Sequence, residues 1–241
     1  MSRLLSLMKM DVMVQLRNNL YTIGVVVAVI TAGMVAWLGS ANQLFSIVPT
    51  LLLLVVGGTT FLYVGALIFF EKDQGTLNAT IVSPVRPSEY LWSKIITLTG
   101  LATLESAIMV GGAMLAMGFS ETVPLPNIPL LLIGTLAIGI LYTLMGVILM
   151  VRYDKITDFL IPMAAVVMIL QLPFVYFWGV FEFPALLVIP TSAPAMLMRG
   201  AFVPLVGWEW AYGVGYTAVL ILTLTVWAYR AFAVHIIMKV R

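Results

Sequence analysis

Long runs of apolar residues, separated by short polar breaks, dominate the pattern along the chain. Six runs with almost no charged residue lie at about 20–38, 47–70, 95–118, 128–151, 159–178 and 210–229. Each is close to the roughly 20 apolar residues that a helix needs to cross a bilayer. Backbone N–H and C=O groups find no partner in lipid, so each run is expected to form a helix. The pattern predicts an all-α integral membrane protein in which residues 1–241 form a single domain with six transmembrane helices.

The first 19 residues follow a different periodicity. Leu4, Leu5, Met8, Val12 and Leu16 recur at helical spacing, whereas the charged residues fall largely elsewhere on the helical wheel. This distribution predicts an amphipathic helix that lies in the inner membrane interface before the first span. The alternative is a frayed tail.

Residues 183–204 are apolar but do not form a regular span. Pro184, Pro190 and Pro194 interrupt them, and proline breaks the helical hydrogen-bond ladder. A re-entrant hairpin that dips into the outer leaflet fits this pattern better, provided that protein covers its irregular backbone.

The positions of the charges predict an orientation. Only 9% of the residues are charged and 62% are hydrophobic, whereas soluble domains carry roughly 25% charged residues. With a cytoplasmic N-terminus, eleven of the twelve basic residues lie on the cytoplasmic side and only Arg199 lies outside, in agreement with the positive-inside rule. Both termini are therefore predicted to be cytoplasmic. The net charge of +2 is too small to indicate nucleic-acid binding.

The sequence offers little catalytic chemistry. Cysteine is absent, which excludes disulfides and thiolate sites. His235 is the single histidine and lies in the C-terminal tail, so neither a His-Glu-x-x-His zinc site nor a serine–histidine pair inside the bilayer is expected. None of the lysines lies between the Gly and the Ser or Thr of a P-loop. We therefore expect no enzyme activity and no cofactor on this chain, and ATP hydrolysis is expected only on another polypeptide.

The longest polar stretch lies between the second and third spans, at residues 71–90. Gly75 can end the second helix in the left-handed conformation. Thr76 can then begin a short helix that extends to about Val82, before Ser83-Pro84 ends it. Such a helix would lie parallel to the membrane, where a soluble partner could push it. An ordinary, well-capped loop is the alternative that the spacing leaves open.

The same stretch resembles the signature of the ABC-2 type transporter permeases. That signature is an acidic residue, a Gly-Thr pair and a proline-containing run with a glutamate, a tyrosine and a lysine. The matching residues are Glu71, Gly75-Thr76-Leu77 and Ser83-Pro84-Val85-Arg86-Pro87-Ser88-Glu89-Tyr90-Leu91-Trp92-Ser93-Lys94. The six-span layout and the dipeptides Leu172-Pro173, Phe183-Pro184, Ile189-Pro190 and Met198-Arg199 also agree, so the resemblance covers nearly the whole chain. The short outer loop at residues 39–46 points to the compact drug- and antibiotic-export branch, including fluoroquinolone exporters.

This resemblance implies the transmembrane subunit of an ATP-driven exporter of hydrophobic or amphipathic drug-like molecules in a bacterial plasma membrane. In the family, the loop after the second span forms a coupling helix seated on the nucleotide-binding subunit. The implied coupling residues are Glu71, Gly75, Thr76, Leu77, Asn78 and Thr80. A cytoplasmic ABC ATPase would bind ATP and magnesium. A second permease copy, identical or related, would complete the transporter in the lipid bilayer.

Two polar residues lie deep within predicted spans. Glu105 is the only ionisable residue near the middle of a span, and Gln171 lies at similar depth, where it could donate a hydrogen bond to Glu105. Ionisable residues in membranes usually face a cavity or a polar partner, so both are candidates for a substrate pathway. The alternative is a neutral carboxyl group that locks two helices together.

Two other functions remain open from the residues. An ATP-independent secondary transporter or channel would use Glu105 as its midplane site. Such transporters commonly show repeated halves, and this sequence shows none. A structural scaffold for another membrane protein is the third alternative, but it explains Glu105 and the polar loop less well.

Overall fold

The computed structural model describes residues 2–76, 85–119, 122–123, 125–181 and 183–237, and these residues form helices joined by short connections. Six helical stretches are long and apolar enough to cross a membrane, which confirms the predicted all-α membrane fold. They are α2 (Leu20–Leu38), the stretch Ala41–Asp73, α6 (Pro87–Met117), α7 (Ile128–Met150), the stretch Ile156–Phe177 and the stretch Gly207–His235.

Three of these stretches contain several elements. Ala41–Asp73 comprises η1 (Ala41–Gln43), α3 (Leu44–Leu51), η2 (Leu52–Val56) and α4 (Gly57–Asp73). Ile156–Phe177 comprises α8 (Ile156–Gln171) and α9 (Phe174–Phe177). Gly207–His235 comprises α11 (Gly207–Trp210), η4 (Ala211–Tyr216), α12 (Thr217–Phe232) and the start of η5 (Ala233–Ile237).

The third span begins earlier than its apolar run. It was expected near residue 95, but α6 starts at Pro87. Proline fits the first turn of a helix because its missing N–H would have no helical partner there. The Glu89 carboxylate also accepts a 2.8 Å hydrogen bond from the Arg86 backbone N–H, which caps the helix start. The additional turns bring Tyr90, Ser93 and Lys94 into the helix.

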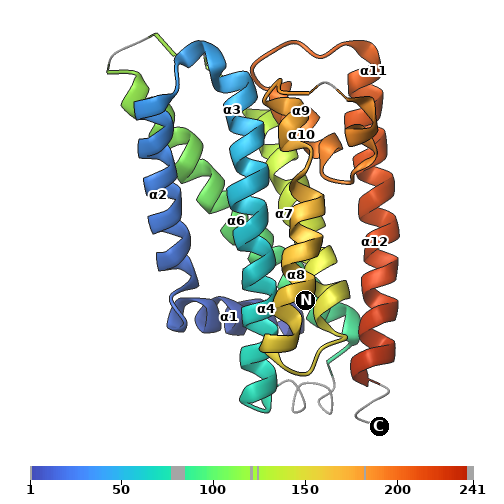
Figure 1. Cartoon of the computed structure of the whole chain (residues 1–241). Helices are drawn as coiled ribbons and strands as arrows, with labels where there is room; N and C mark the ends of the chain where they lie inside the picture. Colours follow the sequence, from blue (N-terminus) through green and yellow to red (C-terminus); the bar gives the residue numbers. More distant parts are fainter. Residues whose placement is uncertain (1, 77–84, 120–121, 124, 182, 238–241) are drawn as a thin grey trace.

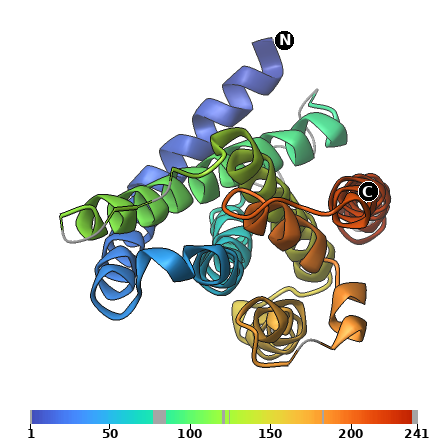
Figure 2. The ribbon, with the colours of Figure 1, turned by 90° about the horizontal axis from the view of Figure 1, so that it is seen from above.

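Helix α7 lies at the centre of the bundle. It packs against α4, α6, α12 and α10 (Ser192–Arg199), while α2 packs mainly against α6. Figure 2 shows α2 and α12 near opposite sides of the bundle. The three peripheral spans that contain α2, α8 and α12 expose most of their apolar side chains, as expected for helices that face lipid.

The N-terminal helix α1 (Ser2–Arg17) lies across one end of the bundle, which we call the α1 end (Figure 1). Leu5, Met13 and Leu16 are exposed, so an apolar face is available to a membrane interface. Another face of α1 packs against the bundle, and this face is partly polar. Asp11 and Gln15 are both buried, because α1 packs against the polar start of α6.

The segment predicted as a re-entrant hairpin contains η3 (Pro184–Val188) and the short helix α10, at the end opposite α1 (Figure 1). Residues Ser192 to Met198 of α10 are all buried. Gly134 of α7 allows this close packing, because an added Cβ would lie 3.0 Å from the Pro194 carbonyl oxygen.

Side-chain hydroxyls satisfy the irregular backbone before α10. Tyr212 donates to the Leu187 carbonyl at 2.5 Å and Tyr216 donates to the Val188 carbonyl at 2.6 Å. Ser192 donates to the Leu186 carbonyl at 2.7 Å. Non-helical backbone at membrane depth needs hydrogen-bond partners within the protein, and these three bonds supply them. The position of the segment relative to a bilayer stays a prediction.

Candidate functional site

The predicted coupling residues begin at the end of α4. Glu71 is buried in its last turn, and Gly75 then adopts φ 68°, the left-handed conformation predicted for it. The Thr76 hydroxyl donates a 3.2 Å hydrogen bond to the Glu71 carbonyl. Leu77, Asn78, Thr80 and the expected short helix lie outside the described residues.

Glu71 belongs to a group of buried charges that we call the charge cluster: Asp11, Glu71 and Lys94, with Tyr90 and Ser93. The Lys94 ammonium forms ion pairs with both Asp11 and Glu71. Tyr90 donates a 2.6 Å hydrogen bond to Glu71, and Ser93 donates to Asp11. The three charged residues are only 1–6% exposed. The cluster therefore joins α1, α4 and α6 in a region where water does not screen the charges.

Sequence reasoning found Glu71 but missed its partners. Asp11 and Lys94 are 83 positions apart, so no local pattern pairs them. Two signals were nevertheless present. Leu7, Asp11 and Gln15 recur every four residues, which places them on one face of α1, and Tyr90 and Lys94 share a face of α6 in the same way. Gln15 extends the polar contact with a 3.1 Å hydrogen bond to the Thr97 hydroxyl.

Glu105 is buried in the middle of α6, and its partner comes from α4. The Thr59 hydroxyl donates to the carboxylate, at 3.1 and 3.0 Å from its two oxygens. No ion pair to Glu105 occurs within the described part of the chain. On α2, Gly24 allows the helix to pack closely against the carboxylate. A Cβ at this glycine would lie 3.6 Å from Glu105 Oε2 and 3.3 Å from the Tyr63 hydroxyl.

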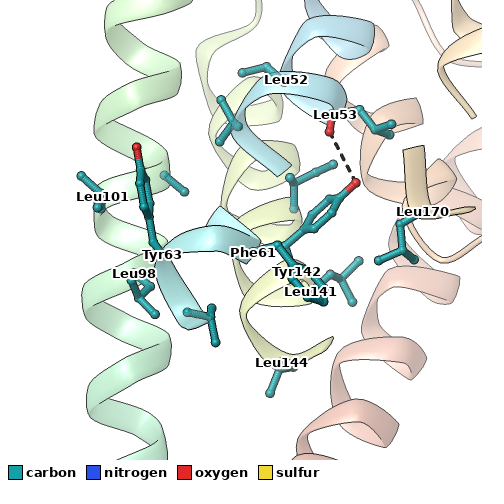
Figure 3. Close-up of a cluster of buried hydrophobic side chains, with 14 of the residues drawn as sticks. Leu52, Leu53, Phe61, Tyr63, Leu98, Leu101, Leu141, Tyr142, Leu144 and Leu170 are labelled. Atoms are coloured by element: carbon teal, nitrogen blue, oxygen red, sulfur yellow. Dashed lines mark hydrogen bonds between the residues drawn. The ribbon is translucent and has the colours of Figure 1, made fainter. Parts of the chain in front are cut away.

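Tyr63 lies one turn beyond Thr59 on α4. Figure 3 shows its ring beside Leu98 and Leu101 of α6. The side chain is only 4% exposed, and its hydroxyl lies close to Thr59 but makes no well-aligned hydrogen bond among the described residues. Buried hydroxyls are normally satisfied, so Thr59 is the candidate partner for this hydroxyl.

Gln171 does not pair with Glu105, contrary to the expected hydrogen bond. Its amide donates instead to the Leu54 carbonyl at 2.8 Å. Leu54 belongs to the π-helical turn η2, where the wider backbone frees carbonyl groups from the helical ladder. The Tyr142 hydroxyl similarly lies 3.4 Å from the Leu53 carbonyl (Figure 3). Gln171 therefore joins α8 to the second span rather than to Glu105.

A cleft of about 450 Å³ opens between α2 and the second span, at the end opposite α1. We call it the α2–α3 cleft. Its walls are largely apolar, with a few polar side chains and one tryptophan from the segment after α9. The lining residues are Thr31, Met34, Val35, Leu38, Gly39, Gln43, Ser46, Ile47, Leu51, Val55 and Trp178. This volume lies within the range of small-molecule sites.

A second cavity of about 450 Å³ lies between α6 and α7. Its described lining contains no ionisable side chain, and Ser106, Thr103 and Thr135 are its main polar residues. The lining of the α2–α3 cleft also contains no ionisable side chain among the described residues, but it includes Trp178, which offers an aromatic surface that the second cavity lacks. Val55 in its wall lies about one helical turn from Thr59, which contacts Glu105. We therefore take the α2–α3 cleft and Glu105 as the candidate substrate pathway.

Six apolar helices, a drug-sized cleft and buried polar groups define a polytopic membrane permease. The sequence model of the fluoroquinolones export permease protein family matches residues 2–240. The chain belongs to this family, which confirms the resemblance to fluoroquinolone exporters. It is also similar to two proteins from two strains of Mycobacterium tuberculosis, each named fluoroquinolones export permease protein. Each is 32% identical over 162 residues, which cover 66% of this chain and 65% of the relative. The aligned region thus spans just under two thirds of each relative.

Proposed function

We propose that this chain is the membrane-spanning subunit of an ATP-driven ABC-2 type exporter in a bacterial plasma membrane. It moves a hydrophobic or amphipathic drug-like molecule out of the cell, and a separate cytoplasmic ATPase binds ATP and magnesium. The charge cluster is the observation that carries this proposal. The coupling segment, residues 71–90, begins at Glu71 and ends at Tyr90, and Lys94 follows one turn later, so buried contacts fix both ends of the segment to the bundle.

The same two helices carry the charge cluster and the midspan carboxylate. Glu71 and Thr59 are 12 residues apart on α4, and Lys94 and Glu105 are 11 residues apart on α6. At 1.5 Å per residue these separations correspond to roughly 16–18 Å along each helix. A displacement of the coupling segment would therefore move Thr59 and Glu105 through two continuous helices, without a flexible joint between them.

We further propose that a second permease copy, identical or related, packs beside this chain in the bilayer. The span that contains α8 makes few contacts within the chain, and it exposes Ile161, Met168 and Ile169. Lipid covers such a surface in a monomer. A second copy would allow two coupling segments to respond to two ATPase subunits.

The second candidate function is an ATP-independent transporter or channel centred on Glu105. The lack of an ion-pair partner for Glu105 favours it, because an unpaired intramembrane carboxylate suits ion or substrate binding. Affinity purification of the tagged chain from its native membrane, followed by mass spectrometry, separates the two functions. A stoichiometric partner with a P-loop supports the ABC exporter. A chain that purifies alone, and forms no complex with ATPases encoded beside it, contradicts that proposal.

Replacing Gly75 with valine is expected to uncouple ATP hydrolysis from export. Valine disfavours the left-handed conformation by about 1–2 kcal/mol, which changes the population of this turn roughly 5- to 30-fold. No atom of the described residues lies within 4 Å of an added Cβ, so among them the substitution perturbs backbone conformation alone. The ratio of drug efflux to ATP hydrolysis in proteoliposomes measures the effect.

Gly100→Val is the matched control, since Gly100 lies within α6 and an added Cβ there also meets no neighbour. It should insert and retain normal coupling. Equal coupling ratios for Gly75→Val, Gly100→Val and the unmodified chain would contradict the assigned role of Gly75.

A further inference from the structure

We infer that the exposed face of α1 binds the headgroups of anionic phospholipids in the adjoining membrane leaflet, and that this contact restrains the end of α4 through Asp11 and Arg17. Lipid binding of this kind is independent of the transported molecule and needs no ATPase.

The exposed charged side chains of α1 are all basic and lie among apolar ones. Lys9 shares a stripe of the helix with Met13 and Leu16, because residues three or four positions apart lie on one face. Arg3 and Arg17 are exposed as well. An interfacial helix of this composition places its apolar side chains at the boundary between headgroups and acyl chains. Its long basic side chains extend from there to the phosphate groups.

The one acidic residue of α1 is withdrawn from this face. Asp11 is 2% exposed, and its carboxylate pairs with Lys94 of α6. The exposed face therefore carries three basic side chains and no acidic one. Each basic residue near an anionic membrane surface strengthens binding about fivefold, whereas a zwitterionic surface has no net charge to attract it. The charge of α1 thus selects anionic lipids.

The position of α1 gives lipids access to this face. The N-terminal half of α1 extends beyond the outline of the bundle (Figure 2), and α4 continues past the level of α1 (Figure 1). In a bilayer that contains the spans, phospholipids therefore lie beside α1. Leu5 and Met13 are each 59% exposed. Free phosphate would leave these apolar side chains uncovered, whereas a phospholipid contacts both them and the basic groups.

Other contacts of α1 join it to the end of α4, where the coupling segment begins. The Lys94 ammonium pairs with both Asp11 of α1 and Glu71 of α4. Arg17 donates a 3.1 Å hydrogen bond to the side-chain oxygen of Gln74, directly after α4. A lipid contact that holds α1 therefore also restrains the last turn of α4.

The absence of cysteine allows lipid binding to be followed with one attached fluorophore. Met10→Cys places an environment-sensitive, uncharged dye on the exposed face of α1, and the full-length chain is studied alone in phosphatidylcholine nanodiscs with increasing phosphatidylglycerol. The emission should change as the anionic fraction rises. Arg3→Gln with Lys9→Gln should raise the fraction at half-maximal change about 25-fold, fivefold for each lost charge.

Arg152→Gln with Lys155→Gln is the matched control. It removes two exposed charges from the loop beside the end of α4 and leaves α1 unaltered, so the half-maximal fraction should stay within about twofold of the unmodified value. Inorganic phosphate added to phosphatidylcholine discs should not reproduce the emission change. Equal shifts for the two double variants would overturn the inference. So would an unmodified chain that does not respond to phosphatidylglycerol, the result expected if α1 docks an acidic protein instead.

Hydrogen exchange tests the link from α1 to α4. Phosphatidylglycerol should slow backbone exchange in the last turn of α4 roughly 2- to 10-fold, the effect of about one additional net hydrogen bond. At a saturating anionic fraction, Arg17→Gln should retain the full emission change but lose part of this protection, because the contact with Gln74 is removed. Exchange that phosphatidylglycerol leaves unchanged in the unmodified chain would overturn the proposed restraint of α4. A purification that finds no ATPase partner would affect neither measurement.

Discussion

Lys94→Met is expected to destabilise the α1 end by about 3–5 kcal/mol, the usual cost of removing one partner from a buried ion pair. Methionine preserves most of the side-chain length but leaves the carboxylates of Asp11 and Glu71 buried together without a cation. The thermal unfolding midpoint of the purified chain, followed by tryptophan fluorescence, should fall markedly.

Two comparisons separate this effect from a general response to losing a lysine. Lys9→Met makes the same change at an exposed position of α1, where substitutions usually alter stability by less than about 0.5 kcal/mol. Combining Lys94→Met with Asp11→Asn and Glu71→Gln should restore most of the lost stability, because no buried charge then remains uncompensated. If Lys94→Met is as stable as Lys9→Met, the charge cluster does not stabilise the bundle.

The charge cluster also illustrates what the sequence could and could not predict. The six spans followed from apolar length, because lipid leaves helices as the only choice for such runs. The periodicity of α1 separated Asp11 from the apolar residues but did not show that Asp11 is buried. Its burial depends on Lys94 and Ser93, which the fold brings together from distant positions. Periodicity can identify which residues share one face of a helix, but it cannot identify the residues that this face contacts.

The polar groups within the membrane show a similar limit. Glu105 and Gln171 were expected to pair because they lie at similar depth in the membrane. Similar depth does not show whether two helices are neighbours or which of their faces are in contact. Helix α8 packs chiefly against α4, so Gln171 meets the Leu54 carbonyl, while Thr59 of α4 reaches Glu105. The π-helical turn that frees the Leu54 carbonyl has no signature in the apolar run that contains it.

Gly57→Ala is expected to disrupt the contact between the second span and α7. An added Cβ would lie 2.5 Å from Cζ and 2.9 Å from the hydroxyl of Tyr142. Tyr142 is fully buried and donates to the Leu53 carbonyl, so its ring cannot move without losing that hydrogen bond. Overpacking of this kind costs about 1–3 kcal/mol. A lower unfolding midpoint and reduced export should result, although alanine alone favours the helix.

A double variant distinguishes close packing from backbone flexibility as the reason for this glycine. Gly57 directly follows the π-helical turn η2, so a hinge would also explain a glycine there. If packing is the reason, Gly57→Ala with Tyr142→Leu should recover much of the stability and export, because the smaller side chain removes the clash. If flexibility is the reason, the double variant should regain stability but not export. Gly111→Ala in α6, where an added Cβ meets nothing within 4 Å, should change neither quantity appreciably, and a loss there equal to that of Gly57→Ala would contradict both explanations.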